Sequence, residues 1–475
     1  MLKLEKYGII IPVIGNGTDN VTIKIISLKG EVVAMKRRVW SLFLCVVMIL
    51  AMFTGCSKKE SKGSVYFLNF KPEVSEIWEE LAKIYKEETG VEVKVKTAAS
   101  GTYEQTLKSE IAKTDAPTLF QINGPVGYQT WKDYCLDLSK TNLYSWLLDK
   151  SLAVSSGEGV YGIPYVVEGY GIIYNDAIMK KYFALSDKAV SISSTSEIKD
   201  FATLKAVVED MTAKKDALGI EGVFASTSLT PGEDWRWQTH LANLPVYYEY
   251  KDKGINDTQK LDFTYSANYK NIFDLYINNS GTVPTMLGGK SVTDSMAEFA
   301  LGKVAMVQNG NWAWGQISGV AGNVVLESDI KFMPIYTGVA GEESQGLCTG
   351  TENFFCVSSK ASKADQEATI AFVEWLFNSD IGKDYVTNKF GFIAPFSTFK
   401  EDEKPTDPLA KEVIRYMEDT SLTSVSWNFT SFPSQTFKDN FGAALLEYVQ
   451  GNIKWEDVVN IVIDQWSAEK AASAQ

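Results

Sequence analysis

The chain has 475 residues, a length that normally divides into two or three domains. Its composition, 45% hydrophobic and 22% charged residues, is that of a globular protein. A net charge of −13 argues against nucleic acid or an anionic membrane surface as a partner, because phosphate binding requires clustered Lys and Arg. The one histidine, His240, excludes multi-histidine metal sites, and a Ser-His-Asp or Cys-His centre would depend on it alone.

The N-terminal region carries the pattern of a targeting segment. Residues 35–38, MKRR, are positively charged, and residues 39–53, VWSLFLCVVMILAMF, form an apolar run too short for a comfortable transmembrane helix. A small residue, Cys56 and a polar stretch follow, so this region resembles a bacterial lipoprotein signal in which Cys56 is diacylated. An uncleaved anchor helix is the alternative, and it also places the rest of the chain outside the cell. The expected segments are a mispredicted N-terminal extension (1–34), a signal peptide (35–55) and a tether (56–63).

The first strand–helix–strand unit is predicted directly after this tether. Residues 64–70 read as a buried strand, and apolar side chains from Ile77 to Tyr85 then recur at helical spacing. Gly90 ends this helix, and residues 91–95 alternate apolar and polar side chains, as a half-buried strand does. Strand, helix and strand within about thirty residues indicate a parallel sheet.

The later elements alternate between short apolar strands and amphipathic helices. Ser362 and Asp365 fit a capping box ahead of a strongly apolar helix, with the serine capping exposed N–H groups and the acid reaching back. No internal repeat stands out. The predicted elements are strands at 118–122, 160–167, 172–175, 303–307 and 354–357, and a helix at about 201–215.

Five cysteines without a C-x-x-C pair do not form a disulfide framework. Cys45 lies in the N-terminal apolar run, which leaves Cys56, Cys135, Cys348 and Cys356. A Cys348–Cys356 bridge and free buried thiols are both compatible with the sequence. Motifs for phosphate-binding loops, zinc proteases and calcium loops do not occur in the sequence, so no cofactor and no metal are expected.

Six segments stand in order along residues 64–392. They are YKEETGVEVKV (85–95), DAPTLFQ (115–121), IPYVVEGYGIIYN (163–175), LGKVAMVQNGNWAWGQI (301–317), KFMPIY (331–336) and GTENFFCVSSKASKADQEATIAFVEWL (350–376). Each is weakly specific alone. In their order and spacing, and together with the lipoprotein signal, they resemble the extracellular solute-binding proteins of ABC sugar importers, the group that contains the maltodextrin-binding proteins. Residues after 395 follow the family pattern less clearly.

The resemblance implies an α/β fold of two lobes joined by a hinge, the periplasmic-binding-protein fold, with the ligand in the interlobe cleft. It also implies a non-catalytic, monomeric lipoprotein that captures a carbohydrate, in particular an oligosaccharide, and delivers it to the permease subunits of an ABC transporter. A lipid on Cys56 would anchor it, extracytoplasmically, to the cell membrane. The implied lobes span 64–166 with 350–392, and 167–349 with 393–475.

A carbohydrate ligand requires two kinds of side chain. C–H groups on its ring faces pack on aromatic planes, and its hydroxyl edges need polar partners. By the resemblance, the turn NGNWAW places Trp312 on a sugar ring, with core packing as the alternative, Asn311 as a candidate helix cap and Trp314 in the core. Glu168 matches a family carboxylate that accepts sugar hydroxyls, with a structural hydrogen bond as the alternative, and Tyr170 beside it is expected to stack or hydrogen-bond.

Strand-end loops supply further candidates, because ligands of α/β sheets bind beyond the carboxyl ends of the strands. A solvated surface charge or a helix cap is the alternative reading for each of these residues. The strand-end candidates are Asn69, Lys71, Glu73, Tyr103 and Asn123.

The segment GEDWRWQTH adds a second group of candidates. If side chains alternate here as in a strand, Trp235 and Trp237 point to one side and Arg236 to the other. The start of an ordinary amphipathic helix is the other reading of this segment. Trp235 is therefore expected to line the second lobe's side of the cleft. Glu352 enters a crossover strand and is expected to face the cleft, and Trp427 is a further candidate.

Two other functions remain open at the level of sequence. A secreted glycoside hydrolase also combines Trp with pairs of carboxylates, and acidic residues are abundant here. The same fold would also accommodate a polyamine, a peptide or a metal complex, and a cationic ligand would suit an acidic chain. A cleft for a cation should show several converging carboxylates, whereas the matched motifs supply mainly Trp, Tyr, Asn and one Glu.

Overall fold

A computed structural model describes residues 62–99, 101–226 and 228–473. The predicted N-terminal extension (1–34), the signal peptide (35–55), the lipidation site Cys56 and nearly all of the tether lie outside the described residues. Within the described ranges, no helix combines the length and the apolar character that crossing a membrane requires.

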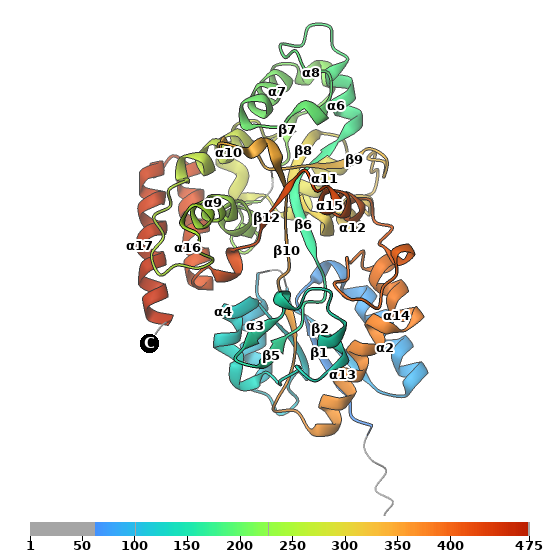
Figure 1. Cartoon of the computed structure of the whole chain (residues 1–475). Coiled ribbons are helices and arrows are strands. Elements are labelled where there is room, and N and C mark those ends of the chain that lie inside the picture. The colour runs from blue at the N-terminus through green and yellow to red at the C-terminus, as the bar shows by residue number, and fades with distance from the viewer. Residues whose placement is uncertain (1–61, 100, 227, 474–475) are drawn as a thin grey trace, which may run out of the picture. The chain divides into compact units, whose positions relative to one another are not determined.

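The first sheet has four strands in the order β11-β3-β1-β2. Figure 1 labels β1 and β2 of this sheet in the lower half of the view. Strand β1 pairs in parallel with both β2 and β3, and β11 runs antiparallel to β3 at the edge. Helix α2 (Ser75–Thr89) connects β1 to β2 and ends at Gly90, whose φ of 74° is left-handed, a conformation that glycine adopts without strain. The predicted strand–helix–strand unit is confirmed. The strands are β1 (Val65–Asn69), β2 (Val93–Thr97), β3 (Leu119–Ile122) and β11 (Phe354–Val357).

Helices cover both faces of this sheet, as a largely parallel sheet requires. On one face, Trp78 of α2 packs edge-on against Phe67 at 4.9 Å and at a tilt against Phe390 at 4.5 Å, in a core shared with α13 (Lys363–Asn378). On the other face, α3 and α4 close a second core around Leu107 and Ile122. The further elements of this half are α3 (Tyr103–Ile111), α4 (Gly124–Trp131), α5 (Asn142–Trp146), β4 (Val154–Ser156), β5 (Gly159–Gly162) and α14 (Asp380–Asp384).

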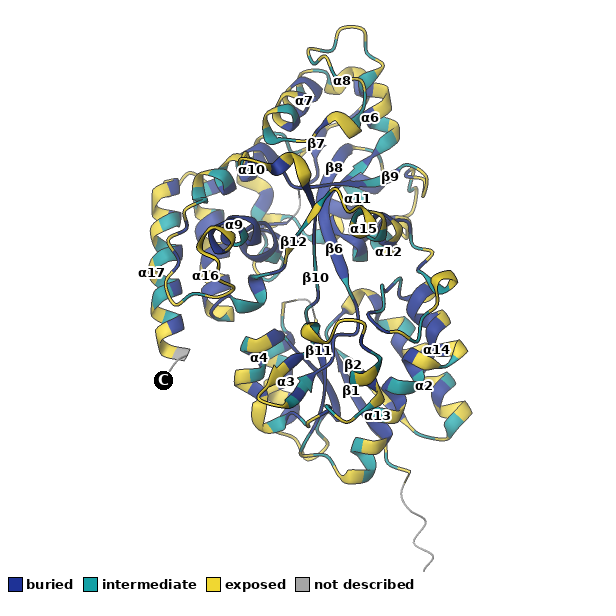
Figure 2. Cartoon of the chain, in the orientation of Figure 1, coloured by how far each residue is buried: buried dark blue, intermediate teal, exposed yellow. Residues whose placement is uncertain are grey.

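The second sheet is mixed, with the order β12-β10-β6-β8-β7 and with β9 also paired to β6. The central strand β6 runs antiparallel to β8, β9 and β10, so the parallel arrangement of the first sheet does not extend to the second. Figure 2 shows β6 and β8 buried among helices whose outer faces are exposed, whereas β12 at the edge is largely exposed. The strands are β6 (Glu168–Asn175), β7 (Gly222–Phe224), β8 (Val304–Gly310), β9 (Ile330–Met333), β10 (Gln345–Gly350) and β12 (Thr423–Ser426).

The C-terminal helices α16 and α17 pack against each other and join the largest core cluster, in which Trp466 is fully buried. Residues after 395 therefore belong mostly to the second half of the fold. The helices of this half are α6 (Asp176–Phe183), α7 (Phe201–Ala213), α8 (Lys215–Leu218), α9 (Asn243–Lys253), α10 (Ser266–Asn278), α11 (Val292–Ala300), α12 (Trp314–Ser318), α15 (Pro408–Glu418), α16 (Gln435–Val449) and α17 (Trp455–Ser473).

The chain passes between the two sheets at neighbouring places. Strand β10 belongs to the second sheet and β11 to the first, so the chain crosses between Gly350 and Phe354. Another crossing precedes β6, where Val167 donates its N–H to the carbonyl of Ile393 at 2.8 Å. Glu168, the first residue of β6, pairs with Gly350 of β10. These contacts bring the crossovers together, as a hinge requires.

Some local predictions need correction. Ser362 does cap α13 by accepting from the N–H of Asp365 at 3.2 Å, but the Asp365 carboxylate accepts from the N–H of Ser64 and from the Ser362 hydroxyl, so it does not complete the box. Cys348 and Cys356 lie in strands of different sheets and both thiols are free. The prediction of free buried thiols is confirmed, and a Cys348–Cys356 bridge is wrong.

Trp78→Ala is expected to lower the free energy of unfolding by about 3–5 kcal/mol, because it leaves a cavity beside Phe67 and Phe390. Urea denaturation followed by circular dichroism measures this change. Leu148→Ala is the control, since Leu148 is 71% exposed and its truncation should stay within about 0.5 kcal/mol of the wild type. Equal effects of the two substitutions would contradict the assigned core.

Candidate functional site

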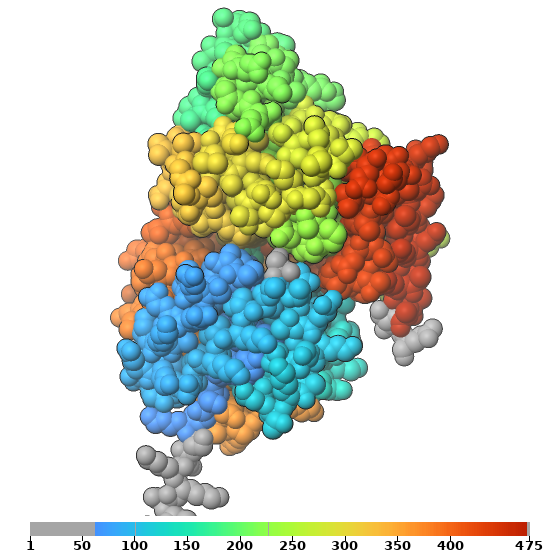
Figure 3. Space-filling model, turned by 180° about the vertical axis from the view of Figure 1, so that it is seen from behind, coloured from blue at the N-terminus to red at the C-terminus, as the bar shows by residue number. Residues whose placement is uncertain are grey.

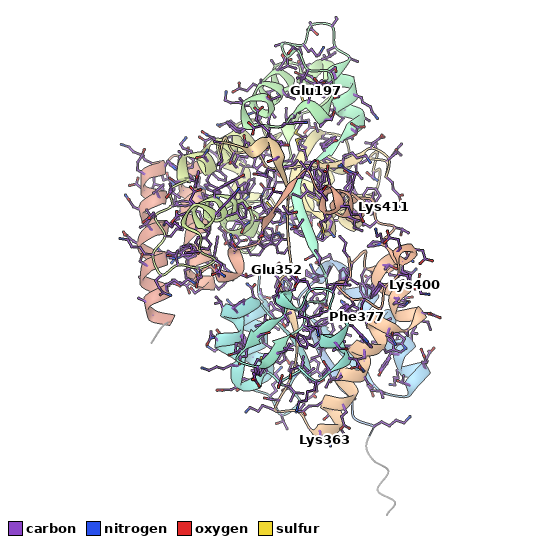
Figure 4. The ribbon with its side chains drawn as sticks, viewed as in Figure 1. Glu197, Glu352, Lys363, Phe377, Lys400 and Lys411 are labelled. Atoms are coloured by element: carbon purple, nitrogen blue, oxygen red, sulfur yellow. The ribbon has the colours of Figure 1, made fainter. Side chains whose placement is uncertain are left out.

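A cavity of about 480 Å³ lies between the two sheets. Loops that follow β1 and β3 line it from the first half, and residues 232–240, the turn after β8 and part of α16 line it from the second. Figure 3 shows the two halves meeting along a seam, with the C-terminal segment (red) beside it, and Figure 4 places Glu352 between the halves. The predicted site residues that line the cavity are Lys71, Glu73, Tyr103, Asn123, Glu168, Trp235, Trp312 and Glu352.

The two halves touch at the rim of the cavity. A Cβ atom on Gly101 would lie 2.6 Å from the carbonyl oxygen of Gly232, so the two loops meet backbone to backbone. A Cβ atom on Gly124 would lie 3.0 Å from the Thr430 side chain. The structure therefore shows a closed arrangement of the lobes.

Trp312 lies in the aromatic wall of the cavity. Its ring packs over Gly310 at the end of β8, where a Cβ atom would come within 2.2 Å of the ring, so only glycine fits. The rings of Trp235 and His240 lie 5.9 Å and 5.7 Å from it, and Phe429 stacks on His240 at 4.6 Å. This wall offers apolar planes to a ligand.

Asn311 does not cap the helix that follows it. Its Oδ1 instead accepts from the N–H of Gly169 at 2.9 Å, which ties the turn after β8 to the start of β6 and fixes the position of Trp312. Trp314 is directed away from the cavity and packs against the core that contains Ile317 and Phe332.

A buried ion pair joins the two halves beside this wall. Lys71 follows β1, and its Nζ lies 2.8 Å from Glu168 Oε1 and 3.7 Å from Glu73 Oε1. The ammonium also lies 5.6 Å from the Trp312 ring. Burial disfavours the charged form of Lys71, but the carboxylates of Glu168 and Glu73 outweigh it and raise its pKa. Burial raises the pKa of Glu168, and Lys71 partly opposes this rise.

Two predicted site residues, Tyr170 and Asn69, are not among the residues that line the cavity. The Tyr170 hydroxyl donates to the backbone carbonyl of His240 at 2.7 Å, and the Tyr170 ring packs against His240 and Trp427. Asn69 donates to the carbonyl of Lys71 at 2.7 Å and accepts from its N–H at 3.1 Å. Both residues support cavity-lining neighbours, and neither lines the cavity itself.

The segment around Trp235 does not alternate as a strand would. Residues 236–241 form a π-helical turn, so Trp235 and Arg236 face the cavity while Trp237 enters the core and donates its Nε1–H to the Ser228 carbonyl at 3.0 Å. The Arg236 guanidinium stacks 3.9 Å from the Trp235 ring and donates to Asn309 at 3.3 Å. Burial lowers the pKa of Arg236 to about 9.

Glu352 lines the cavity at the crossover between β10 and β11. Burial raises its pKa to about 7, against the opposing effect of Lys71 and Lys438. Asn353 beside it has a φ of 60°, a left-handed conformation that Asn tolerates better than most residues.

Sequence reasoning missed the contribution of the C-terminal region. Gln435, Lys438 and Asp439 of α16 line the cavity, and Gly442 lets the helix approach Asp234 so closely that a Cβ atom would lie 1.8 Å from Oδ2. These four residues stand at i, i+3, i+4 and i+7, which places them on one helix face. A polar stripe with a glycine on a largely apolar helix was the available signal.

The lining carries more charged side chains than the predicted candidates Lys71, Glu73, Glu168 and Glu352. Lys71, Arg236 and Lys438 are the basic residues of the lining. The acidic residues of the lining are Glu73, Glu104, Glu168, Glu233, Asp234, Glu352 and Asp439.

Several polar atoms of lining side chains have no hydrogen-bond partner among the described residues. Each of these unpaired atoms has lost its hydrogen bonds to water, and a polar ligand can remove this energetic cost by hydrogen-bonding to the atom. The atoms are Asn123 Oδ1, Gln238 Oε1, His240 Nε2, Trp312 Nε1, Gln316 Oε1 and Asn353 Nδ2. No group of three His, Cys, Asp or Glu side chains within the described ranges is arranged to hold a metal ion.

Comparisons with known proteins identify the family and the fold. The family model for bacterial extracellular solute-binding proteins covers residues 80–412, so the chain belongs to that family. A chitin oligosaccharide binding protein shares the fold, with 16% identity, a TM-score of 0.66 and coverage of 86% of this chain and 100% of that chain. RafE in complex with raffinose shares 19% identity with a TM-score of 0.65, and the match covers 86% of this chain and 99% of that chain. Maltose-bound MalE3 of T. maritima shares 13% identity with a TM-score of 0.63, and the match covers 85% of this chain and 99% of that chain. No curated protein sequence matches the chain.

Lys71→Met is expected to lower the free energy of unfolding by about 3–5 kcal/mol, because it leaves the Glu168 carboxylate buried without its cation. Glu168→Gln in the same chain should restore most of this loss, since it removes the orphaned charge. Urea denaturation of both single variants and the double variant measures the coupling. Strict additivity of the two single effects would contradict a direct ion pair.

The raised pKa of Glu352 predicts a pH dependence of stability. With a pKa of about 7 in the folded state and an ordinary value of 4.5, the folded protein holds an extra proton between these pH values. Stability should therefore fall as the pH rises through this window, and Glu352→Gln should remove the fall. Thermal unfolding of both proteins from pH 4 to pH 8 tests this. If the stability of the wild type and of Glu352→Gln depends on pH in the same way, the pKa of Glu352 is not raised in the folded state.

Proposed function

We propose that this protein captures a carbohydrate in the cavity between its lobes. The observation that carries the proposal is the Trp312 ring, which stands beside the Lys71–Glu168 ion pair in a closed cavity. The ring offers an apolar face to sugar C–H groups, and the ion pair offers charged partners to sugar hydroxyls. The volume of about 480 Å³ lies within the roughly 300–1,000 Å³ that ligand pockets occupy.

The relatives support the same class of ligand. Structures of this fold have been solved for a chitin oligosaccharide binding protein, for RafE with raffinose and for MalE3 with maltose. They differ in their sugars, so the ligand of this chain depends on its own lining residues. We infer a non-catalytic capture role, because the matched family and these neighbours are binding proteins.

The setting that we propose is an ABC importer. The protein would be monomeric and extracytoplasmic, anchored to the cell membrane by a lipid on Cys56, and its closed form would be presented to the permease subunits. The lobes would comprise residues 64–166 with 350–392, and 167–349 with 393–475, a division that the two sheets support. Hinge closure around the ligand is the motion expected of such lobes.

A thermal-shift screen is the direct test of the ligand class. Neutral mono-, di- and oligosaccharides are compared with polyamines and short peptides, because a ligand at 100 times its Kd stabilises the folded state by about 2.7 kcal/mol. Stabilisation by a sugar supports the proposal. Stabilisation only by a polyamine or a peptide would overturn it, and release of reducing sugar would indicate a hydrolase instead.

Trp312→Ala is expected to weaken binding of the best sugar by roughly tenfold to a hundredfold, since the lost ring contact corresponds to about 1.4–2.8 kcal/mol. Isothermal titration calorimetry measures the change. Trp314→Ala is the matched control, because it removes an indole two residues away that packs outside the cavity. Unchanged affinity in Trp312→Ala would place the sugar elsewhere.

A further inference from the structure

Two glycines of the first half form close contacts with the second half beside the cavity. Gly101 lies between β2 and α3, and Gly124 begins α4 directly after β3. A Cβ atom on Gly101 would lie 2.6 Å from the carbonyl oxygen and 2.9 Å from the Cα atom of Gly232. A Cβ atom on Gly124 would lie 3.0 Å from the Cβ atom of Thr430. We call these two pairs the closure contacts, and neither has room for an added methyl group.

The two closure contacts differ in how far they can yield. Gly101 faces backbone atoms, which no side-chain rotation can move away. Gly124 faces the side chain of Thr430 in the short turn Phe429–Ser431, and its nearest neighbour is 0.4 Å farther away than that of Gly101. A methyl group at Gly101 would therefore separate the lobes more than a methyl group at Gly124.

Both glycines also have a left-handed backbone, with φ of 71° at Gly101 and 63° at Gly124. Side chains are strained in this conformation, so a substitution there combines local strain with the effect on the lobe contact. Gly157, between β4 and β5, separates the two effects. Its φ is 58°, and a Cβ atom on it would meet nothing within 4 Å.

The closure contacts lie next to residues that line the cavity. Gly101 and Gly232 belong to the lining themselves, and the other pair directly follows the lining residues Asn123 and Phe429. Any separation at these points moves lining residues of the two halves apart. A ligand held from both sides then loses contacts on one of them.

We propose that the closure contacts set how far the lobes close, so that Gly101, and to a smaller extent Gly124, determine ligand affinity through lobe closure. The inference rests on the proposed function and assigns it two positioning residues. These residues act by leaving space for the opposite lobe and need no bond to the ligand.

The test compares Gly101→Ala, Gly124→Ala and Gly157→Ala with the wild type. Isothermal titration calorimetry uses raffinose, maltose or diacetylchitobiose, whichever the wild type binds most tightly, and small-angle X-ray scattering measures the radius of gyration with and without that sugar. Gly101→Ala should weaken binding by about tenfold or more and reduce the compaction on binding, because apparent affinity falls with the population of the competent closed form. Gly124→Ala should show a smaller loss. Gly157→Ala should retain the wild-type affinity and compaction.

A second substitution across the contact separates closure from local strain. Thr430→Gly removes the Cβ atom that a methyl group at Gly124 would meet, so it should restore most of the affinity that Gly124→Ala loses. It should not restore the affinity of Gly101→Ala, which meets a different loop. Strain confined to Gly124 would not respond to a change in the opposite lobe, so absence of this rescue would contradict the Gly124–Thr430 contact.

Wild-type affinity and compaction in Gly101→Ala, or equal losses in Gly101→Ala and Gly157→Ala, would overturn the inference. The proposed function would still stand if Trp312→Ala weakens sugar binding in the same assay. If the wild type binds spermidine or a peptide and no sugar, the proposed function fails, and the same comparison with that ligand decides the closure contacts separately.

Discussion

The ion pair between Lys71 and Glu168 is the contact on which the site depends. It is buried, it joins the end of β1 in the first sheet to the start of β6 in the second, and it lies beside Trp312. A buried charge without its partner is strongly unfavourable, so the pair keeps the two strand ends together in the closed arrangement. The hydrogen bond from Gly169 to Asn311 extends the same connection to the turn that carries the indole.

The cavity joins an aromatic wall to a charged lining in which acids outnumber bases. Such a lining is poorly matched to an anion, because most of its acids already lack a cation partner. It is equally poorly matched to a simple cation, because Lys71, Arg236 and Lys438 stand among the acids. An uncharged molecule with many hydroxyls and apolar ring faces can hydrogen-bond to both the acidic and the basic residues and can also pack against the aromatic wall. That match links the residues of this chain to the sugar-binding structures that share its fold.

Local sequence patterns predicted the first sheet well, because β1, α2 and β2 are set by periodicity and by the stop at Gly90. They failed around Trp235, where a π-helical turn directs adjacent side chains in ways that strand alternation does not describe. Trp312 and Glu168 were found through family motifs, and the cavity contains both. Tyr170 and Asn69 have side chains that could bind a sugar, but their polar groups form hydrogen bonds with backbone carbonyls instead. Lys438 was missed because its local signal, a polar stripe on a largely apolar helix, does not show which surface that helix faces.

The sequence by itself determined the class of fold, the family and the aromatic and acidic residues around which a sugar site is built, because these depend on local periodicity and short motifs. Only the tertiary structure decided which of these residues face the cavity, that Lys71 pairs with Glu168 across the two sheets, and that α16 brings Lys438 into the same cavity lining. The physical reason is distance along the chain. Burial and charge pairing arise between segments far apart in the sequence, 97 residues for Lys71 and Glu168, and no local pattern encodes which of them meet.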